Sequence, residues 1–192
     1  MARPREFDAE RALERATAVF WSRGFEQSSL DDLCAATGLN RSSFYAAFHS
    51  KRDLYLRALA RYEDGSAARI ADALEGKPIR EGIRLFLDGL IDAIVAGPGR
   101  RGCFIGNCAA EMARLDRGAA ARVRRSLARL ESAFREGLEN ARARGELARG
   151  VDTQALARFL TAGIQGLRLV GKANPDRATL NDIANTMLHC LD

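Results

Sequence analysis

Residues 29–51 carry the strongest structural signal in the chain and read Ser-Leu-Asp-Asp-Leu-Cys-Ala-Ala-Thr-Gly-Leu-Asn-Arg-Ser-Ser-Phe-Tyr-Ala-Ala-Phe-His-Ser-Lys. One run with apolar residues at helical spacing stops at Gly38, and a second, with Phe44 and Phe48, follows after residues 38–40. So short a connection is typical of two helices that meet at a steep angle, often with a Gly between them. The segment therefore predicts a helix-turn-helix motif.

The residues that flank these two helices agree with this prediction. Ser29 and Asp32 form a capping-box pattern that begins the first helix. Gly38 suits the left-handed position that ends it, and Asn40 is a good N-cap for the second. Ser50 begins a further helix in the same way.

The second helix of the motif has two faces with different tasks. Phe44 and Phe48 are four residues apart and are expected to pack inward. Arg41, Ser42 and Ser43 occupy the first turn, where an Arg can pair with guanine and a helix amino end attracts phosphate. These residues predict contact with a DNA major groove; the alternative is that Ser42 and Ser43 only solvate a surface turn.

Composition limits the class of protein. With 192 residues, 47% hydrophobic and 29% charged, the chain is expected to form one or two soluble domains. It has no apolar run of the roughly 18 residues that a membrane helix needs and no apolar N-terminal signal region, so we expect a cytoplasmic protein without a membrane partner. The four Cys lack the spacing of a disulfide framework and are expected to be reduced.

Net charge does not by itself indicate DNA binding. The chain carries a formal charge of +5, but its first 55 residues hold as many acidic as basic side chains. The prediction of a DNA partner therefore depends on where the cations lie, namely at Arg41, Lys51, Arg3 and Arg5.

Helical periodicity continues to the C-terminus without a convincing strand pattern, so the fold class is all-α with about nine helices. Beyond the motif and a helix at 8–24, we expect a connecting helix over about 51–75 and a helix from 79 to the Gly-rich break at 97–102. Further helices are expected over about 103–115, from about 123 to 145, over 152–174 and near the C-terminus.

At this point the sequence resembles the TetR family of bacterial transcriptional regulators. The resemblance runs from Ala12 to Leu59 and is carried by Arg23-Gly24-Phe25, residues 28–33, 35–39 and 41–45, Phe48, Lys51 and Asp53-Leu54. It implies an Ω-shaped homodimer that binds a palindromic double-stranded DNA operator, with a DNA-binding domain at 1–50 and a ligand-binding and dimerisation domain at 51–192. The implied function is a repressor that a small-molecule effector or a thiol modification releases.

The resemblance also suggests site residues. Family members typically touch DNA through the positions of Ser29, Arg41, Ser43, Tyr45 and Lys51, with the last two on phosphate. Asn40 and Ser42 depart from the commoner residues, so base preference is not transferred. The predicted DNA-binding set is Ser29, Asn40, Arg41, Ser42, Ser43, Tyr45, His49 and Lys51.

A ligand pocket is expected among the C-terminal helices. Its predicted lining is Tyr62, Phe86, Leu90, Cys103, Phe104, Asn107, Glu111 and Phe134. Asn107 and Glu111 are four apart and thus share one helix face, where they could orient a ligand. The alternative is an apolar core from which both point to solvent.

Cys103 is the candidate redox sensor. Residues 102–111 resemble a Gly-Cys…Ala-Glu signature of a family subset in which some members sense electrophiles through the Cys at this position. We expect Cys103 in the first turn of a helix, where the helix dipole and the adjacent Arg100 and Arg101 would favour the thiolate. The alternative is an inert, packed thiol.

The two C-terminal helices are the candidate dimer surface. Gly163 and Gly166 interrupt an apolar helix at about 1 kcal/mol each relative to Ala, which suggests a close approach to that backbone. A symmetric dimer would match two DNA half-sites, whereas the alternative is that both helices only cover the monomer's core. The predicted interface is Leu160, Gly163, Ile164, Gly166, Leu167, Ile183 and Met187.

An enzyme is the least favoured class. His49 and His189 lie far apart, and no phosphate-binding loop, zinc-spaced Cys/His set or nucleophile elbow occurs. We therefore expect neither a cofactor nor a metal. A helical interaction module or a small-molecule-binding protein without operator binding remains the alternative.

Overall fold

The computed structural model describes residues 8–192, which form nine α-helices and one 3₁₀ turn, with no strand in this part of the chain. The all-helical prediction is confirmed, and the predicted arm with Arg3 and Arg5 lies outside the described residues. The elements are α1 Ala9–Arg23, α2 Leu30–Thr37, α3 Arg41–Phe48, α4 Lys51–Leu74, α5 Ile79–Val95, η1 Pro98–Arg101, α6 Phe104–Glu111, α7 Arg117–Ala143, α8 Thr153–Ala173 and α9 Arg177–His189.

The predicted caps determine where the first helices begin and end. Ser29 and Asp32 form the complete capping box of α2, and the Asn40 side chain accepts the Ser43 backbone N–H at the start of α3. Gly38 closes α2 with φ of 74°, a left-handed conformation that suits a residue without Cβ. The helix-turn-helix is therefore built as its sequence predicts.

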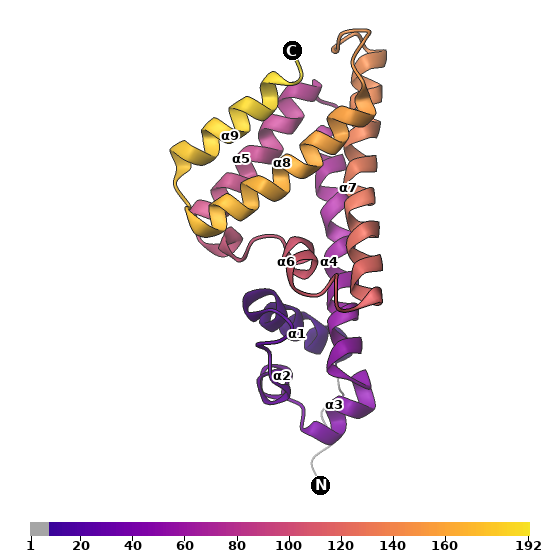
Figure 1. Ribbon diagram of the computed structural model, residues 1–192, viewed down its shortest axis with the longest axis vertical. Helices are drawn as coiled ribbons and strands as arrows, with labels where there is room; N and C mark the ends of the chain where they lie inside the picture. Colours follow the sequence, from indigo (N-terminus) through magenta and orange to yellow (C-terminus); the bar gives the residue numbers. More distant parts are fainter. Residues whose placement is uncertain (1–7) are drawn as a thin grey trace.

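Helices α1, α2 and α3 gather at one end of an elongated molecule, around the first part of α4 (Figure 1). Phe20, Leu33, Phe44 and Phe48 are buried there, so the apolar faces of the three helices meet in one core. The opposite face of α3 is left for solvent.

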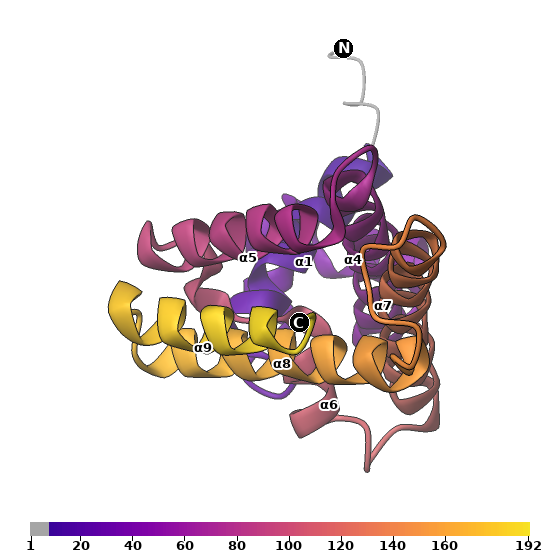
Figure 2. The ribbon, with the colours of Figure 1, turned by 90° about the horizontal axis from the view of Figure 1, so that it is seen from above.

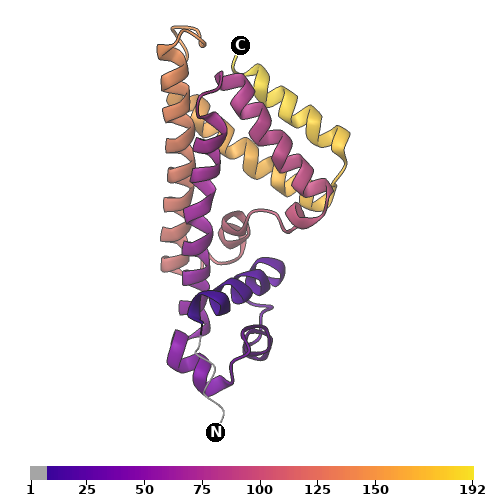
Figure 3. The ribbon, with the colours of Figure 1, turned by 180° about the vertical axis from the view of Figure 1, so that it is seen from behind.

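The long helices α4 and α7 lie side by side and connect this end with the rest of the molecule (Figures 1 and 3). Beyond them, α8 and α9 lie next to α5, as the view from above shows (Figure 2). Ile83, Leu87, Leu138, Leu160 and Leu180 are buried in the core that these helices share.

The two hydrophobic cores do not divide at the predicted boundary between residues 50 and 51. The core of the helix-turn-helix end also contains Leu54, Tyr55 and Leu59 of α4 and Phe104 and Cys108 of α6. Helix α6 therefore packs into the DNA-binding end, although the chain reaches it only after α5.

Some helix bounds differ from the periodicity. The helix expected over 103–115 ends at Glu111, and residues 112–115 form turns before Asp116 caps α7. The Gly-rich break at 97–102 contains η1. Periodicity locates apolar faces, but the ends depend on caps such as Asp116, whose carboxylate accepts the Ala119 N–H.

Candidate DNA-binding surface and effector cavity

Helix α3 presents its polar first turn at the end of the molecule. Arg41, Ser42 and Ser43 are exposed, and Tyr45 keeps 52% of its surface open. Phe44 and Phe48 are buried beneath them and hold the helix to α1 and α4. The geometry brings five of the predicted DNA-binding residues, Asn40 to Ser43 and Tyr45, to one exposed surface.

Arg41 is already paired within the motif. Its guanidinium donates to both carboxylate oxygens of Asp31, with Nε–Oδ1 at 3.1 Å, Nη2–Oδ1 at 2.8 Å and Nη2–Oδ2 at 3.1 Å. Both side chains are exposed, so this bidentate contact links α2 to α3 while leaving the guanidinium accessible. A base contact by Arg41 must compete with Asp31.

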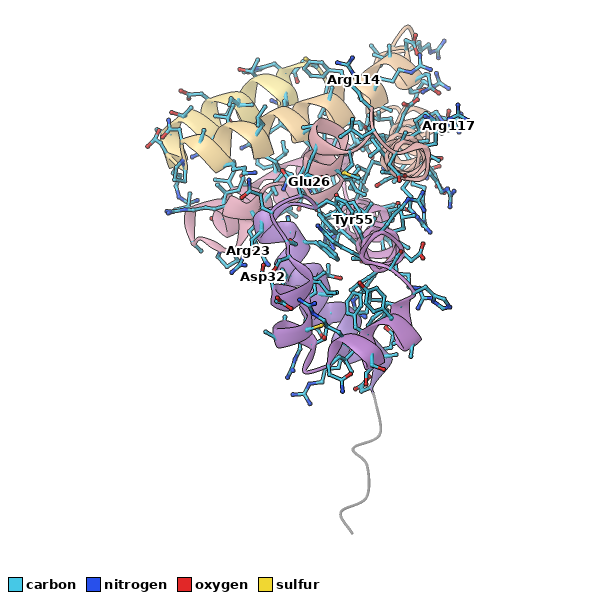
Figure 4. All side chains as sticks on the ribbon, turned by 60° about the horizontal axis from the view of Figure 1, so that its bottom comes forward. Arg23, Glu26, Asp32, Tyr55, Arg114 and Arg117 are labelled. Carbon is cyan, nitrogen blue, oxygen red and sulfur yellow. The ribbon has the colours of Figure 1, made fainter. Side chains whose placement is uncertain are left out.

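Two predicted DNA contacts are also structural. The Asn40 Oδ1 accepts the Ser43 N–H at 2.8 Å, so this oxygen caps α3. The Ser29 hydroxyl lies 2.7 Å from Asp32, whose pKa is lowered to about 2, chiefly by this hydrogen bond. Arg23 also lies 2.6 Å from Asp32 (Figure 4).

His49 and Lys51 lie on either side of Ser50 in the connection between α3 and α4. His49 is exposed and takes φ of 63°, the one positive φ among non-Gly residues in the described chain. Its N–H donates to the Tyr45 carbonyl and closes α3. The Lys51 ammonium lies 4.3 Å from the centre of the Phe25 ring, a cation–π contact that positions it beside the motif.

A cavity of about 560 Å³ lies between α4, α5, η1 and α8, with a wall from α1. Tyr62, Phe86 and Leu90, all predicted pocket residues, line it. Leu85 and Ala93 add to its apolar wall. Its volume is in the range of small-molecule sites, which is about 300–1,000 Å³.

The other predicted pocket residues lie elsewhere. Cys103 and Asn107 line a separate groove of about 370 Å³ along α6 and α8, and Phe104 is buried among Trp21, Tyr55 and Tyr62. Phe134 is buried behind Phe86 and does not reach the cavity. Asn107 donates to the Arg101 carbonyl at 2.9 Å and so fixes the end of η1.

Glu111 connects the two ends of the molecule. Its carboxylate accepts the backbone N–H groups of Phe25 and Glu26 at 2.9 and 2.8 Å, so α6 holds the loop between α1 and α2. Gly24 takes φ of 84°, a conformation that L side chains rarely adopt, and an added Cβ would also lie 2.7 Å from the Glu111 Oε2. This position corrects the prediction that Glu111 faces the pocket.

Sequence reasoning missed five residues that bring polar groups to the lining of the cavity: Trp21, Arg69, Asp72, Arg101 and Arg168. The Trp21 Nε1 donates to the Gly102 carbonyl at 3.1 Å, and the Arg101 guanidinium lies 4.3 Å from the centre of its ring. The available signals were the single Trp of the chain and an Arg four residues after the buried Ile164.

Cys103 is the N-cap residue of α6 and is buried. The Tyr62 hydroxyl lies 3.7 Å from its Sγ and donates toward it, and burial raises the pKa of that hydroxyl. Of the two cations expected beside the thiol, Arg101 lies over Trp21 and Arg100 is exposed.

The predicted dimer residues of α8 face the protomer's own core. Leu160, Ile164 and Leu167 are buried there with Met187 of α9, and Gly163 makes room for the Met187 side chain, whose Cε would lie 2.6 Å from an added Cβ. Ile183 is half-buried.

The outer face of α8 is also apolar. Phe159 and Leu169 remain 44% and 70% exposed, and Gly166, between them, is exposed with no atom within 4 Å of an added Cβ. Ala155 and Ala162 lie on the same exposed stripe, at spacings of three and four residues. We name Ala155, Phe159, Ala162, Gly166 and Leu169 the outer stripe of α8.

Neither a membrane-spanning helix nor a metal-binding cluster occurs in the described part of the chain. No helix there is long and apolar enough to cross a membrane. The same residues contain no group of three or more His, Cys, Asp or Glu arranged to hold a metal ion.

Family profiles match most of the chain. Residues 12–58 match "Bacterial regulatory proteins, tetR family" and residues 80–187 match "Tetracyclin repressor-like, C-terminal domain". The first match covers the helix-turn-helix, and the second covers α5 to most of α9.

Individual relatives match the chain over at least nine-tenths of their length. The chain is 35% identical to YezE of Bacillus subtilis, an uncharacterized HTH-type transcriptional regulator, with all of both chains covered. It is 33% identical to ComR of Escherichia coli, an HTH-type transcriptional repressor, over 97% of this chain and 90% of ComR. A cysteine mutant of CifR in complex with 26-bp operator DNA has a TM-score of 0.84 and 31% identity, with both chains fully covered.

Proposed function

The chain belongs to the TetR family of bacterial regulatory proteins, and we propose that it is a cytoplasmic repressor that binds a palindromic operator as a homodimer and is released by a small-molecule effector or thiol modification. The family consists of transcriptional regulators, so the chain is a regulator and not an enzyme. The observation that carries the proposal is the exposed first turn of α3, held on a buried pair of Phe side chains. CifR, of similar sequence and fold, has been solved with operator DNA.

The proposed DNA contacts are of two kinds. Arg41, Ser42, Ser43 and Tyr45 are placed to meet base edges and nearby phosphates, whereas Lys51 at the start of α4 is placed for phosphate. Ser29, Asn40 and His49 lie at the ends of α2 and α3 and also shape the motif. Because Asp31 already binds Arg41, its charge would disfavour wrong sequences in which Arg41 finds no base acceptor.

The test begins with genomic fragments selected by the purified protein, followed by titration of the recovered site. Arg41→Ala should weaken binding to that site by about 1–3 kcal/mol and relax sequence preference. Lys51→Ala should instead lower the slope of log K against log salt by about 1, because one phosphate contact is lost.

Arg142→Ala is the control for both variants, since Arg142 is exposed in the last turn of α7, at the end of that helix away from the Asp116–Arg52 pair. Recovery of no specific fragment by the wild-type protein would favour the alternative, a helical module that does not bind an operator. Unchanged operator affinity in both Arg41→Ala and Tyr45→Ala would instead place the DNA contacts outside the first turns of α3.

Thiol modification is tested at Cys103. Its burial and its place next to Tyr62 support an effect on structure once an adduct forms, because the space around the sulfur is filled. Wild type treated with a small maleimide should lose operator affinity, and Cys103→Ser should keep it. Equal loss in both proteins, or in neither, would remove Cys103 as the sensor; Cys190, which is exposed, provides the comparison thiol through Cys190→Ser.

A further inference from the structure

Arg168 of α8 is one of the positively charged residues that line the cavity. Its Nη1 donates to the Tyr62 hydroxyl at 2.9 Å, and its Nε is buried without a hydrogen-bond partner. Among the described residues no carboxylate lies within ion-pair distance of this guanidinium, although burying a charge without a paired group is costly. The cation therefore lacks a counter-charge from the described part of the chain.

The surrounding lining does not supply that counter-charge. Arg69, Arg101 and Arg168 line the cavity together with one acidic residue, Asp72. Three cations against one anion produce a positive potential in a space with mostly apolar walls, where charges interact more strongly than in water.

A second donor without a partner lies one helical turn from Arg168. The Gln165 Nε2 is buried without a hydrogen bond, and both side chains line a space of about 10 Å³ beside Tyr62 and Cys103. That space is about the size of one water molecule. Water could satisfy the two donors, but it could not neutralise the guanidinium.

The rest of the cavity is suited to hydrocarbon. Leu85, Phe86, Leu90 and Ala93 of α5 line it, and so do the Trp21 and Tyr62 rings, whose centroids lie 4.9 Å apart. A ligand that fills such a site needs an apolar body with one acceptor group at its end.

We propose that the effector is an amphipathic monocarboxylate whose carboxylate pairs with Arg168 and whose aryl or alkyl part packs against α5. This inference depends on the proposed function, because it assigns the effector of that regulator to this cavity. A carboxylate would give Arg168 its missing counter-charge through a charge-assisted hydrogen bond from the guanidinium. A sugar phosphate fits less well, since the opposite wall offers it almost no polar partner.

The occupant would also touch the DNA-binding end directly. Trp21 belongs to α1, and its indole is held between Arg101, the Gly102 carbonyl and Tyr62. A ligand seated between Arg168 and Phe86 therefore contacts α1 without an intermediate element. Displacement of Trp21 would change the position of α1 relative to α4.

The experiment uses matched probes: 3-phenylpropanoate against 3-phenylpropanamide, and octanoate against octanamide. The carboxylates should raise the melting temperature of the wild-type protein and release operator DNA, and the amides should do so at least tenfold less effectively. Arg168→Met should weaken carboxylate binding at least tenfold, while Arg168→Lys, which keeps the charge, should lose less. Arg100→Met is the matched control, because Arg100 is exposed and outside the cavity lining.

Gly89→Leu is the second variant and keeps the cationic site. An added Cβ at Gly89 meets no atom within 4 Å, so a Leu can enter the cavity without a clash and should exclude both probes while the fold is retained. Equal binding of acid and amide, full carboxylate affinity in Arg168→Met, or no melting shift with either acid would each overturn the inference. Operator binding without ligand is measured separately, so a protein that binds DNA but no carboxylate refutes only this inference.

Discussion

The capping pair Ser29 and Asp32 determines both where α2 begins and how α2 is joined to α1. The Ser29 hydroxyl accepts the Asp32 N–H at 3.0 Å and the Asp32 carboxylate accepts the Ser29 N–H at 3.0 Å. Since α2 is short and contributes only Leu33 as a fully buried side chain, its end contacts matter for its position. Arg23 on α1 binds the same carboxylate, so the cap also holds α1 to α2.

Ser29→Ala should lower the free energy of unfolding by about 1 kcal/mol, the usual effect of losing an N-cap. The Asp32 pKa is lowered from 3.8 to about 2 in the folded protein, so its stabilising contribution is present above pH 4 and is lost as the pH falls toward 2. Chemical denaturation across this range should therefore give a shallower pH dependence in the variant. Ser132→Ala, an exposed site on α7, is the control. If the unfolding free energy of Ser29→Ala depended on pH as that of the wild type does, the Ser29–Asp32 hydrogen bond would not be the cause of the lowered pKa.

Helix α6 contacts both the loop between α1 and α2 and the residues around the cavity. Its first residue, Phe104, contacts Trp21, Tyr55 and Tyr62, and its last, Glu111, accepts two N–H groups from the α1–α2 loop. The turn before it contributes Gly102 to the lining of the cavity. We therefore expect a movement at that turn to reach the loop that positions α2.

Glu111→Ala should lower the free energy of unfolding by about 1–3 kcal/mol, because two backbone donors lose a charged acceptor. It should also weaken operator binding, since the loop that positions α2 is freed. Glu111→Gln keeps one acceptor oxygen, so its free energy of unfolding and its operator affinity should lie between those of the wild type and of Glu111→Ala. Glu26→Ala removes an exposed side chain from the same loop while leaving its N–H bonded, so an equal effect of that control would show that Glu111 has no special part.

The assembled protein has an apolar surface that its own chain does not cover. The outer stripe of α8 exposes Phe159 and Leu169 on either side of Gly166, and Ile183 of α9 is half-buried. Soluble proteins seldom leave such a stripe open unless it is an interface. We therefore place the proposed dimer contact on this face, with Gly166 allowing the two copies to approach.

Leu169→Glu should shift the protein from dimer to monomer and weaken operator binding, because two buried charges would face each other across a two-fold axis. Sedimentation over a concentration series measures the shift. Leu115→Glu is the matched control, since Leu115 is 75% exposed in the turn between α6 and α7. A tight dimer in Leu169→Glu would place the interface elsewhere.

The elements near the N-terminus could be derived from local signals alone. Caps at Ser29, Asn40 and Ser50, the left-handed Gly38 and the spacing of Phe44 and Phe48 act within a few residues, so their consequences do not depend on distant parts of the chain. The same holds for the helical periodicity that predicted the all-α class.

Which face of a helix is buried and which is exposed could be determined only from the tertiary structure. Helix α8 is apolar on two sides, and periodicity favoured Leu160, Ile164 and Leu167 for the dimer, whereas packing against α5, α7 and α9 buries them and exposes Phe159 and Leu169. Arg168 and Trp21 are 147 positions apart, and no local pattern could bring them to one cavity. Spacing specifies which side chains share a face, but only the contacts among distant helices specify what that face meets.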